Sequence, residues 1–573
     1  MFGWWDCCTS CCDSVYEDIA EEPHTFSLPS PLPRWPEGKD FATGKISLGE
    51  IEVVQNVKFE KIWSCSPLLG KAKGVTFYKP VEIPDGFFSL GHYCQPSDKK
   101  LRGYVLVAKD ISENTPDDVR INVFRSSNSP PLKKPLNYTL VGSQNSNQDT
   151  CGYIWLPNPP AGYEPMGFVV TTEPDEPHPD EVRCVRTDLT ESCEVNEVIF
   201  NVNSFSLKDQ LYVWDIRPCK RGMLCKGVPV GTFFCSRDKN PEDDKLSVSC
   251  LKNHDSSLLA MPNLDQIHAL IKHYGPTLYF HPDETYLPSS VSWFFKNGAL
   301  LFKQGRNKGL SIDSKGSVLP YGGSNDGEFW LDLPDDDDGR EFVSRGDIDS
   351  AELYVHVKPA LGGTFTDIAM WLFCPFNGPA TIKAGLWTYT CKRIGQHIGD
   401  WEHFTLRLSN FNGELSSVYF SEHSGGEWLD ASELEFIEGN KAIVYASKNG
   451  HASFPHEGCY IQGSSKLGIG ARNDCARSDF FVDSSDRYRV VAAEYLGDDV
   501  FADEPRWLQY MREWGPRVVY DSRSELEKIL KHLPFFVRFS VENLIELFPT
   551  ELYGEEGPTG PKEKDNWLWD ERC

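Results

Sequence analysis

The stretch FYKPVEIPDGFFSLGHYC, residues Phe77–Cys94, contains the pattern that decides the fold of the first half of the chain. It contains an aromatic residue, a proline and a glycine, and then an apolar strand that ends near another glycine. The same order returns in IWLPNPPAGYEPMGFVV (Ile154–Val170) and, less closely, in VWDIRPCKRGMLCKGVPVGTFFC (Val213–Cys235). Self-similarity of this kind indicates a module built by repetition. The pattern predicts a β-prism-like repeat module over residues 25–258, and an ordinary β-sandwich with similar turns is the alternative.

A single helix and a second set of strands follow the repeats. In MPNLDQIHALIKHYGP, Asn263 can cap the first turn and a Gly-Pro pair ends the pattern, so residues 259–275 are predicted to contain a junction helix. Alternating patterns such as ELYVHVKP and HFTLRLS then predict a β-sandwich over residues 276–515. Residues 516–573 are predicted to form helices and a flexible tail, and residues 1–24 a separate tail. The chain is therefore expected to be mainly β.

The charge balance excludes one class of partner. The 573 residues contain 57 Lys and Arg against 84 Asp and Glu, which gives a formal net charge of −27. Nucleic-acid binding needs a basic stripe that neutralises phosphates, and the sequence contains no such stripe. We therefore expect no nucleic-acid partner.

The first dozen residues, MFGWWDCCTSCC, place four cysteines beside aromatic side chains. The sequence shows no secretory signal and no apolar run of about 20 residues, so the 18 cysteines are expected to be reduced thiols in the cytosol. Clustered thiols beside interfacial aromatics favour S-acylation, with a metal site and an inert tail as alternatives. This predicts a cytoplasmic protein peripheral to an endomembrane or the plasma membrane. The predicted lipidation sites are Cys7, Cys8, Cys11 and Cys12.

Charged residues gather at the start of one predicted strand, in GQHIGDWEHFTLRLS (Gly395–Ser409). On a strand, Asp400 and Glu402 share a face with the three apolar residues that alternate after them, so both enter on the buried side. Two inward carboxylates repel each other unless one is protonated or a cation lies between them. His397 can bend in as a third group, and oxygen-rich sites suit hard divalent cations. The pattern predicts a site for Mg, Ca or Mn; a carboxylate pair that caps turns or meets nearby arginines is the alternative.

Other polar residues stand at the ends of predicted strands, where they can join the same binding pocket. The segments are YFHPDETYLP, YFSEHSGGEW and SKNGHASFP, and the candidate pocket residues are His281, His423, Ser424 and His451. Each of these alone is typical of a turn. The sequence contains no phosphate-binding loop, dinucleotide fingerprint, nucleophile elbow or His-Glu-x-x-His helix. A non-enzymatic function is therefore favoured.

Several long stretches carry a family resemblance that covers about residues 25–573. They include TFYKPVEIPDGFFSLGHYCQP, YGPTLYFHPDETYLPSSVSWFFKNGALL, AELYVHVKPALGGTFTDIAMWLFCPFNGPA and NGHASFPHEGCYIQGSSKLGIGARND. They resemble the vacuolar protein sorting-associated protein 62 family, and most closely its plant branch. The resemblance implies a role in delivery to the vacuole, and it implies no chemical mechanism.

A more distant resemblance concerns the charged stretch. DIAMWLFCPFNG…GQHIGDWEHFTLRL is similar to the core of the necrosis-inducing cytolysins, whose heptapeptide reads Gly-His-Arg-His-Asp-Trp-Glu. In that family a His, an Asp and a Glu at offsets 0, +3 and +5 bind a divalent cation in a β-sandwich. His397, Asp400 and Glu402 stand at those offsets here, whereas Ile398-Gly399 replaces Arg-His. A further aspartate of the family falls on Asn377, so the resemblance implies a metal site with one carboxylate fewer.

Three functional hypotheses follow. The first is a non-enzymatic peripheral-membrane protein of vacuolar or endosomal sorting that binds lipid headgroups, glycans or a protein partner, with a divalent cation at the site. The second is a structural scaffold without a small ligand. The third is a hydrolase, which would need a cation with an open coordination position and a water molecule. Its candidate residues are His397, Asp400, Glu402, His423 and His451.

Overall fold

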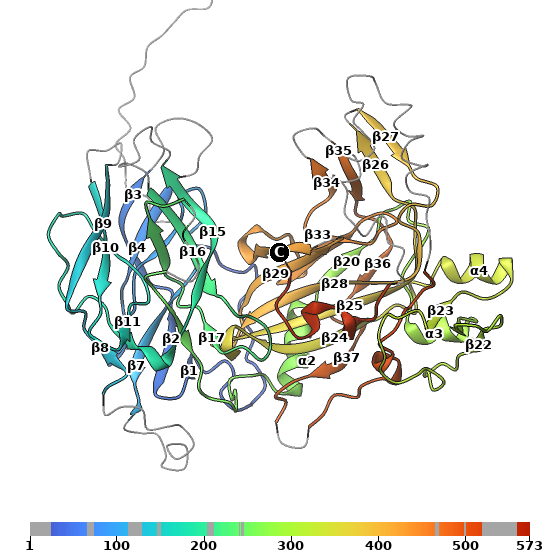
Figure 1. The fold of residues 1–573 in the computed structure, drawn as a ribbon, viewed down its shortest axis with the longest axis horizontal. Coiled ribbons are helices and arrows are strands. Elements are labelled where there is room, and N and C mark those ends of the chain that lie inside the picture. Colours follow the sequence, from blue (N-terminus) through green and yellow to red (C-terminus); the bar gives the residue numbers. More distant parts are fainter. Residues whose placement is uncertain are drawn as a thin grey trace, which may run out of the picture.

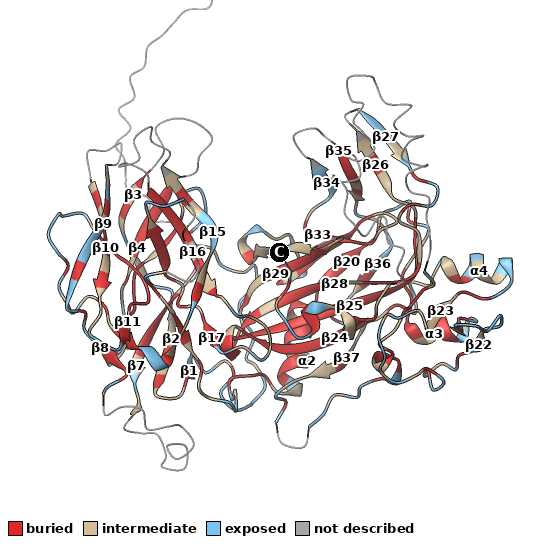
Figure 2. Ribbon diagram, in the orientation of Figure 1, coloured by how far each residue is buried: buried red, intermediate tan, exposed pale blue. Residues whose placement is uncertain are grey.

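The structure is a computed structural model of the chain. It describes residues 25–65, 74–112, 129–145, 151–202, 211–239, 241, 246–384, 386–423, 425–464, 469–497, 500–517 and 558–572. Two β-rich halves lie side by side, the first drawn in blue to green and the second in green to red (Figure 1). Buried residues line the strands inside each half (Figure 2). Strands far outnumber helices, which confirms the expected mainly β fold.

The first half is built from short strands. Its first group is β1 (Lys45–Ser47), β2 (Ile51–Asn56), β3 (Phe59–Cys65), β4 (Val75–Pro80), β5 (Phe88–Ser89), β6 (Tyr93–Pro96) and β7 (Val105–Asp110). The second group is β8 (Leu132–Lys133), β9 (Asn137–Asn145), β10 (Cys151–Asn158), β11 (Tyr163–Glu164), β12 (Val169–Thr171) and β13 (Cys184–Arg186). The third is β14 (Thr190–Glu191), β15 (Cys193–Val202), β16 (Leu211–Pro218), β17 (Gly227–Val228), β18 (Phe233–Ser236) and β19 (Cys250–Lys252).

The strands of the three groups pair in the same way: adding six to each strand number of one group gives the corresponding strand of the next. One sheet of each group has the order β3-β4-β6, β9-β10-β12 or β15-β16-β18. The other pairs β2-β7-β5, β8-β13-β11 or β14-β19-β17, and β1 extends the first of these. The three sequence repeats begin in the central strands β4, β10 and β16. The predicted repeat-built prism is therefore confirmed.

Small residues let the three groups meet. Gly91, Gly167 and Thr232 stand just before β6, β12 and β18. A Cβ on Gly167 would lie 2.5 Å from the Cβ of Thr232, and one on Gly91 would lie 2.8 Å from its methyl carbon. Two glycines thus leave room for one larger residue. Beside them, the rings of Phe168 and Phe233 stack with centroids 5.8 Å apart in the core of this half.

The second half contains two main sheets and two smaller ones. The central sheet consists of β24 (Leu353–Ala360), β25 (Phe365–Asn377), β28 (His397–Ser409), β29 (Leu415–Glu422), β30 (Gly425–Asp430) and β37 (Tyr488–Ala493). The second sheet consists of β20 (Thr277–Tyr279), β31 (Phe436–Ile437), β32 (Lys441–Ala446), β33 (Ser453–Phe454) and β36 (Phe481–Asp483). The smaller sheets are β21 (Leu300–Lys303), β22 (Leu310–Ser311) and β23 (Phe329–Asp332), and β26 (Thr381–Ala384), β27 (Trp387–Thr390), β34 (Gly458–Ser464) and β35 (Ile469–Cys475).

The central sheet has the order β30-β29-β28-β25-β24-β37, and the second sheet β31-β32-β20-β36, with β33 paired to β32. One apolar core contains residues from both sheets, so this half is the expected β-sandwich. Helices α3 (Val291–Lys296) and α4 (Asp337–Ser344) lie at its outer edge (Figure 1).

The predicted junction helix is α2 (Leu264–Tyr274). The Asn263 side chain accepts a hydrogen bond from the Gln266 N–H, and the Gln266 side chain accepts one from the Asn263 N–H, which makes a capping box. The apolar stripe of α2 is part of the sandwich core, together with Phe41. Phe26 and Trp35 pack against the same core, although the sequence-based division grouped residues 25–44 with the repeats.

Aromatic side chains cover the opposite face of the central sheet. The ring centroid of Trp401 lies 5.4 Å from that of Trp507 and 5.0 Å from that of Trp514. Between His397 and Trp401 the backbone of Gly399 has φ +70°, and a Cβ there would lie 2.3 Å from the Trp514 carbonyl oxygen. Only glycine fits this close approach.

The C-terminal residues 558–572 cross this aromatic face. Trp567 stacks on His356 at 3.9 Å, and the buried Lys358 ammonium donates to the carbonyls of Asn566 and Trp569. Glu571 is also buried. The flexible tail expected from the sequence is therefore packed over residues 558–572. Of the predicted helices after the sandwich, a short 3₁₀ turn forms at Arg506–Gln509, and residues 518–557 lie outside the described part.

Arg407 lies where the C-terminal segment meets the central sheet. Its guanidinium donates to both carboxylate oxygens of Asp367 at 2.8 Å and to Asp570 at 2.8 Å. It also lies over the Trp428 ring, 4.0 Å from the centroid. The other oxygen of Asp570 accepts from Arg221 of the first half at 3.1 Å. The C-terminal segment thus links the two halves.

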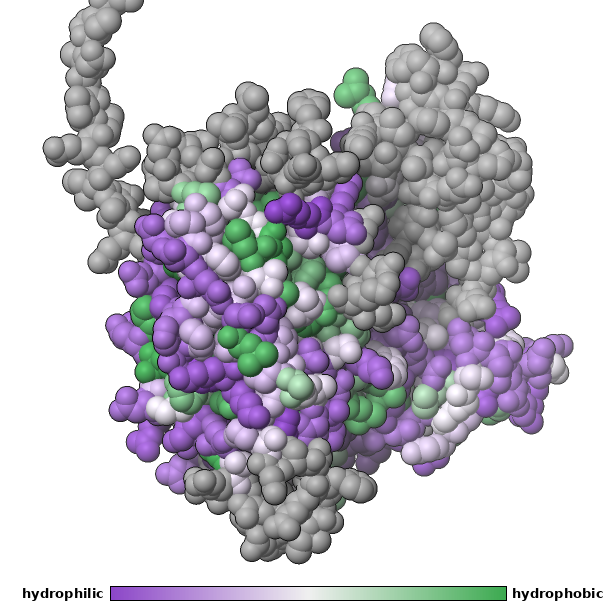
Figure 3. All heavy atoms as spheres, turned by 60° about the vertical axis from the view of Figure 1, so that its left-hand side comes forward, coloured by the Kyte–Doolittle hydropathy of each residue, from purple (hydrophilic) through white to green (hydrophobic). Residues whose placement is uncertain are grey.

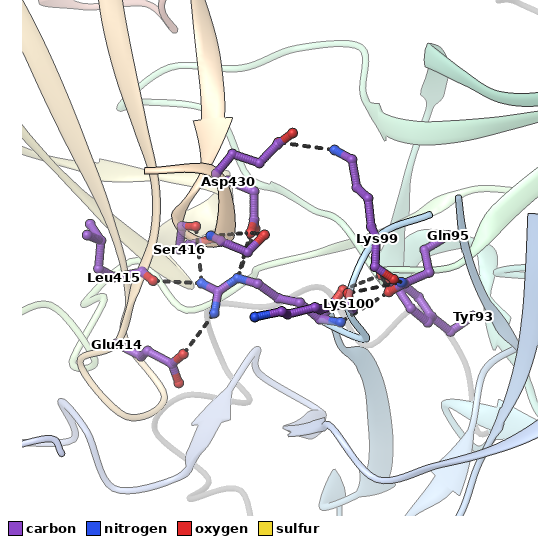
Figure 4. A network of polar contacts seen from close by, with 11 residues as sticks. Tyr93, Gln95, Lys99, Lys100, Glu414, Leu415, Ser416 and Asp430 are labelled. Atoms are coloured by element: carbon purple, nitrogen blue, oxygen red, sulfur yellow. Dashed lines mark hydrogen bonds and ion pairs between the residues drawn. The ribbon is translucent and has the colours of Figure 1, made fainter. Parts of the chain in front are cut away.

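A second link between the halves is centred on Arg102. Its guanidinium donates to Asp430 at 2.9 Å, to Glu414 at 3.2 Å, and to two backbone carbonyls (Figure 4). These two carbonyls belong to Leu415 and Ser416. Lys99 forms a more exposed ion pair with Glu433 nearby, at 3.0 Å. Charged contacts therefore fix how the prism meets the sandwich.

The outer surface of the first half is mixed in character. On the face that Figure 3 brings forward, apolar side chains lie in small groups between polar ones. Across the described residues, no helix has the length and apolar character that crossing a bilayer requires.

Candidate functional site

Two paired strands bring the predicted site residues to one end of the central sheet. β25 and β28 run antiparallel, with Asn377 opposite His397 and Cys374 opposite Asp400. Phe404 belongs to the core between the sheets, whereas Trp401 belongs to the aromatic cluster on the other face. Asp400 and Glu402 alternate in step with Phe404. They therefore enter from the side of the sandwich core.

A cavity of about 60 Å³ lies at this end of the sheet. It brings together five of the predicted residues and adds three others whose side chains carry hydrogen-bond donor groups. The predicted ones are His397, Asp400, Glu402, Asn377 and His423; the added ones are Lys448, Arg472 and Asn473. The remaining lining comes mainly from the backbone around Gly378–Thr381, where β26 begins. The cavity thus has a mixed polar and apolar lining and is placed at the foot of the β26–β27 hairpin.

His451 lies behind the cavity. Its Nε2 donates to the Tyr286 carbonyl at 2.8 Å, and its Nδ1 lies 3.2 Å from Asp400 Oδ2. Because a carbonyl and a carboxylate both only accept, this geometry suits the doubly protonated ring. Burial alone would lower the pKa of His451, but the Cys374 sulfur, Asp400 and Glu284 more than reverse this and raise it well above its ordinary value. Asp400 is therefore already paired with a buried cation.

The two carboxylates of the cavity differ in their ionisation. Burial, followed by the charge of Asp400, raises the pKa of Glu402 to about 8, although Ser421 Oγ donates to it at 2.9 Å. Burial opposes ionisation of Asp400 too, but the hydrogen bond from His451 and the charge of His397 lower its pKa. At neutral pH Asp400 is thus charged and Glu402 carries the proton, which resolves the repulsion that the sequence predicts.

In metal-free buffer, the unaltered chain should lose stability as the pH rises from about 4.5 to about 8, because Glu402 is forced to ionise in a buried position. The variant Glu402→Gln should not show this loss. The unfolded state ionises Glu402 near its ordinary pKa of 4.5, while the folded state keeps the proton up to about 8. The folded state binds more protons over this interval, so the free energy of unfolding falls as the pH rises. The neutral Gln side chain has no such dependence.

Denaturant unfolding of both proteins at about pH 5 and about pH 8.5, with a chelator present, measures this difference. The stability of the variant relative to the unaltered chain should rise by a few kcal/mol over that interval. A relative stability that is the same at both pH values would show that Glu402 titrates normally.

The other predicted residues are placed as follows. His423 lines the cavity and lies 3.0 Å from Asn473 Oδ1 through its Nε2. His281 is not part of the lining: its Nδ1 accepts from the Asp283 N–H at 3.1 Å, in a turn. Ser424 and the four cysteines of the predicted lipidation site (Cys7, Cys8, Cys11, Cys12) lie outside the described residues.

The sequence-based reasoning missed Lys448 and Arg472. Both stand in segments without a recognisable motif, SKNGHASFP and GIGARND. They reach the cavity because β35 and the turn after β32 meet the start of β26 there. Contacts of this kind depend on pairing between distant strands.

The donor types fit a divalent cation, while the geometry is not closed around one. His397 Nδ1 is buried without a hydrogen-bond partner, and His397 Nε2 lies 3.8 Å from Asp400 Oδ1. Asn377 uses its amide to donate to the Gly395 carbonyl at 2.6 Å, beside these donors. Within the described residues, no three His, Cys, Asp or Glu side chains already stand in a metal-holding arrangement. A cation would have to draw His397 and Glu402 inward.

Three solved structures that share a partial likeness with this chain are all of low sequence identity. GNIP1Aa from Chromobacterium piscinae is 15% identical, with 39% of this chain and 40% of that chain covered and a TM-score of 0.29. NLPPya in complex with mannosamine is 14% identical, with 46% and 89% covered and a TM-score of 0.19. Necrosis and Ethylene inducing Protein 2, from the causal agent of cocoa's Witches Broom disease, is 14% identical, with 40% and 76% covered and a TM-score of 0.19.

Comparison of sequences gives a family. Vacuolar protein sorting-associated protein 62 of Saccharomyces cerevisiae (strain ATCC 204508 / S288c) is 25% identical over 216 residues, which cover 32% of this chain and 44% of the yeast protein. The match thus spans less than half of that relative. The family profile described as Vacuolar protein sorting-associated protein 62 matches residues 22–571, nearly the whole chain. The chain therefore belongs to the vacuolar protein sorting-associated protein 62 family.

Proposed function

We propose that this protein acts in vacuolar or endosomal sorting as a peripheral-membrane protein that recognises a hydroxyl-rich lipid headgroup in the cavity beside Asp400. Membership of the family points to vacuolar protein sorting. The observation that supports a headgroup site is the mixed lining of the cavity, in which carboxylates face Lys448, Arg472 and amide groups. Hydroxyl groups both donate and accept, so they suit such a lining better than a phosphate, which Asp400 would repel.

The size of the cavity limits what can enter. About 60 Å³ is room for roughly two water molecules, so one hydroxymethyl group or one cation fits and the rest of a headgroup stays at the opening. When bound, a divalent cation would supply positive charge that draws the proton off Glu402 and orients ligand hydroxyls. His397, Asp400 and Glu402 would hold it, with the Asn377 oxygen as a fourth donor. The acylation predicted for Cys7, Cys8, Cys11 and Cys12 would add an anchor.

If a cation binds, the free energy of unfolding should rise with its concentration, by about 2.7 kcal/mol at 100 times its dissociation constant. Glu402→Gln is the variant of choice, because Asp400→Asn would also break the pair with buried His451. Melting temperatures with Ca²⁺, Mg²⁺ or Mn²⁺ should rise in the unaltered chain and stay constant in Glu402→Gln. Equal rises in both proteins would place the cation elsewhere.

The headgroup is tested by cosedimentation with phosphatidylcholine vesicles that contain or lack a hexosylceramide. The unaltered chain should bind the glycolipid vesicles more tightly, and Glu402→Gln should lose this preference. Glu341→Gln, which alters an exposed carboxylate on α4, is the matched control and should keep it. Equal binding of the unaltered chain to both vesicle types would refute the proposed headgroup site.

A further inference from the structure

The β26–β27 hairpin presents two large apolar side chains to solvent. Leu386, in the turn, is fully exposed at 101%, and Trp387, the first residue of β27, is 58% exposed. The hairpin rises from the sandwich at its upper edge, away from both cores (Figure 1), and β27 shows exposed residues (Figure 2). Leu386 has the largest exposed fraction among the large hydrophobic residues that the structure describes. Two adjacent large apolar side chains at the end of a hairpin are stabilised when an apolar surface covers them.

The charge around the hairpin is opposite to that of the chain. Residues 378–396 contain Lys383, Lys392 and Arg393 and no Asp or Glu, although the whole chain carries −27. Arg472 stands on the neighbouring β35, where it pairs with Asp474 at 2.8 Å and donates to Thr388 of the hairpin at 3.0 Å. A local excess of cations beside exposed Leu and Trp matches an anionic bilayer surface, where apolar insertion and attraction to acidic lipids act together.

The hairpin and the cavity share the same residues at their base. Thr381, the first residue of β26, lines the cavity, and so does Ala471 of β35, the partner of Ile382 in the sheet. The aromatic Trp387 and Tyr389 lie on β27, at the edge of this sheet. Trp and Tyr are enriched at the depth of lipid headgroups. Insertion of the hairpin would therefore bring the opening of the cavity to the headgroup layer.

We propose that the β26–β27 hairpin is the membrane-contacting element of this protein, with Leu386 and Trp387 inserted into the interfacial region of an anionic bilayer. The inference rests on the proposed function of the cavity for its biological meaning, but the physical claim is separate. The hairpin supplies affinity for the bilayer surface, and the cavity supplies preference for a headgroup. The two contributions respond to different substitutions.

The test uses the full chain and vesicles of phosphatidylcholine with or without phosphatidylserine. Leu386→Ser combined with Trp387→Ser should lower the affinity for the phosphatidylserine vesicles by about a hundredfold, since each buried side chain of this size contributes at least about tenfold. Lys383→Gln should lower it by about fivefold, and added salt should remove most of that difference. Leu386→Phe should keep the affinity of the unaltered chain.

The matched control is Leu136→Ser with Leu224→Ser, two leucines of the prism that are 68% and 71% exposed. It should bind as the unaltered chain does. Circular dichroism of all variants verifies that they fold, which exposed positions favour. Affinity of the hairpin variant equal to that of the unaltered chain would overturn the inference. Failure of the unaltered chain to bind these vesicles would also overturn it. An oligomer that forms in the unaltered chain and is lost only in the hairpin variant would overturn it too, because the hairpin would then contact protein.

The proposal for the cavity and the proposal for the hairpin are contradicted by different results. If the hairpin inference fails and the headgroup proposal holds, Leu386→Ser/Trp387→Ser keeps the affinity of the unaltered chain for phosphatidylserine vesicles, and the preference for hexosylceramide remains sensitive to Glu402→Gln. If the headgroup proposal fails and the hairpin inference holds, Glu402→Gln and the unaltered chain bind phosphatidylserine vesicles equally and show no preference for hexosylceramide. The hairpin variant then binds these vesicles about a hundredfold less tightly.

Discussion

Arg407→Met should lower the free energy of unfolding by about 3–5 kcal/mol, because it leaves two carboxylates without their buried cation. The Asp367 side chain is 2% exposed and that of Asp570 16%. Both accept from the guanidinium at 2.8 Å, and Met cannot replace these hydrogen bonds although its volume is similar. The contact over the Trp428 ring is lost as well. Denaturant unfolding at neutral pH measures the change.

Arg489→Met is the matched control for this variant. Arg489 also donates to a carboxylate at 2.8 Å, but its partner Asp503 is 92% exposed. An exposed pair contributes about 0–1 kcal/mol, so this variant should stay close to the unaltered chain. If both variants lose the same amount, burial does not decide the strength of the Arg407 contacts.

Arg102→Met should uncouple the unfolding of the two halves and lower the stability of their interface by about 2–5 kcal/mol. The Arg102 side chain is 14% exposed, and its loss leaves Asp430, Glu414 and two carbonyls with unmet hydrogen-bonding capacity. Each half has its own core, so each can unfold separately once the contact between them weakens. Calorimetry should show one transition in the unaltered chain and two in the variant.

Lys99→Met tests whether any charge at this interface has the same effect. Lys99 pairs with Glu433 across the interface, but the side chains are 39% and 44% exposed. Its loss should leave a single transition and cost about 0–1 kcal/mol. Two transitions in the unaltered chain itself would mean that the halves unfold independently even with Arg102 in place. That result would contradict the proposed coupling role of Arg102.

The sequence predicts the repeat module well because its signal is local. The order of aromatic, proline, glycine and apolar strand lies within each copy, and the same order sets β4, β5 and β6 in the first. The helix α2 is predicted for the same reason, since Asn263 and Gln266 make their cap within one turn. The contact of Gly91 and Gly167 with Thr232 was not predicted. It forms only when the three copies assemble, so no single copy contains a signal for it.

The candidate site is predicted only in part from the sequence. Residues on one strand can be placed by alternation, whereas residues that arrive from distant segments cannot. Alternation along one strand is enough to place Asp400 and Glu402 on the same side as Phe404. It gives no information about His451, whose ring reaches Asp400 from a turn after β32. That pair decides which carboxylate is ionised, so the electrostatics of the site depend on a long-range contact that no local pattern records.

The C-terminal segment is a case in which the local sequence predicts mobility and long-range contacts produce a packed structure. GEEGPTGPKEKDNW is polar and rich in Gly and Pro, which is typical of a mobile tail. Trp567 at its end, and Asp570 and Glu571 just after it, find partners on β24 and β28 that are distant in sequence. The buried cations Lys358 and Arg407 find acceptors at Asn566, Trp569 and Asp570, so the end of this polar segment packs on the sheet.

The arrangement of that segment has a consequence for synthesis on the ribosome. β28 is complete at Ser409, yet the residues that cover its charged face begin about 150 residues later, a delay of roughly 8–30 s at common elongation rates. During that time Arg407 and Lys358 stand on a nascent sheet without Asp570 and the carbonyls of Asn566 and Trp569. Chains that stop early would keep this face open, which gives quality control a feature by which to distinguish unfinished molecules from finished ones.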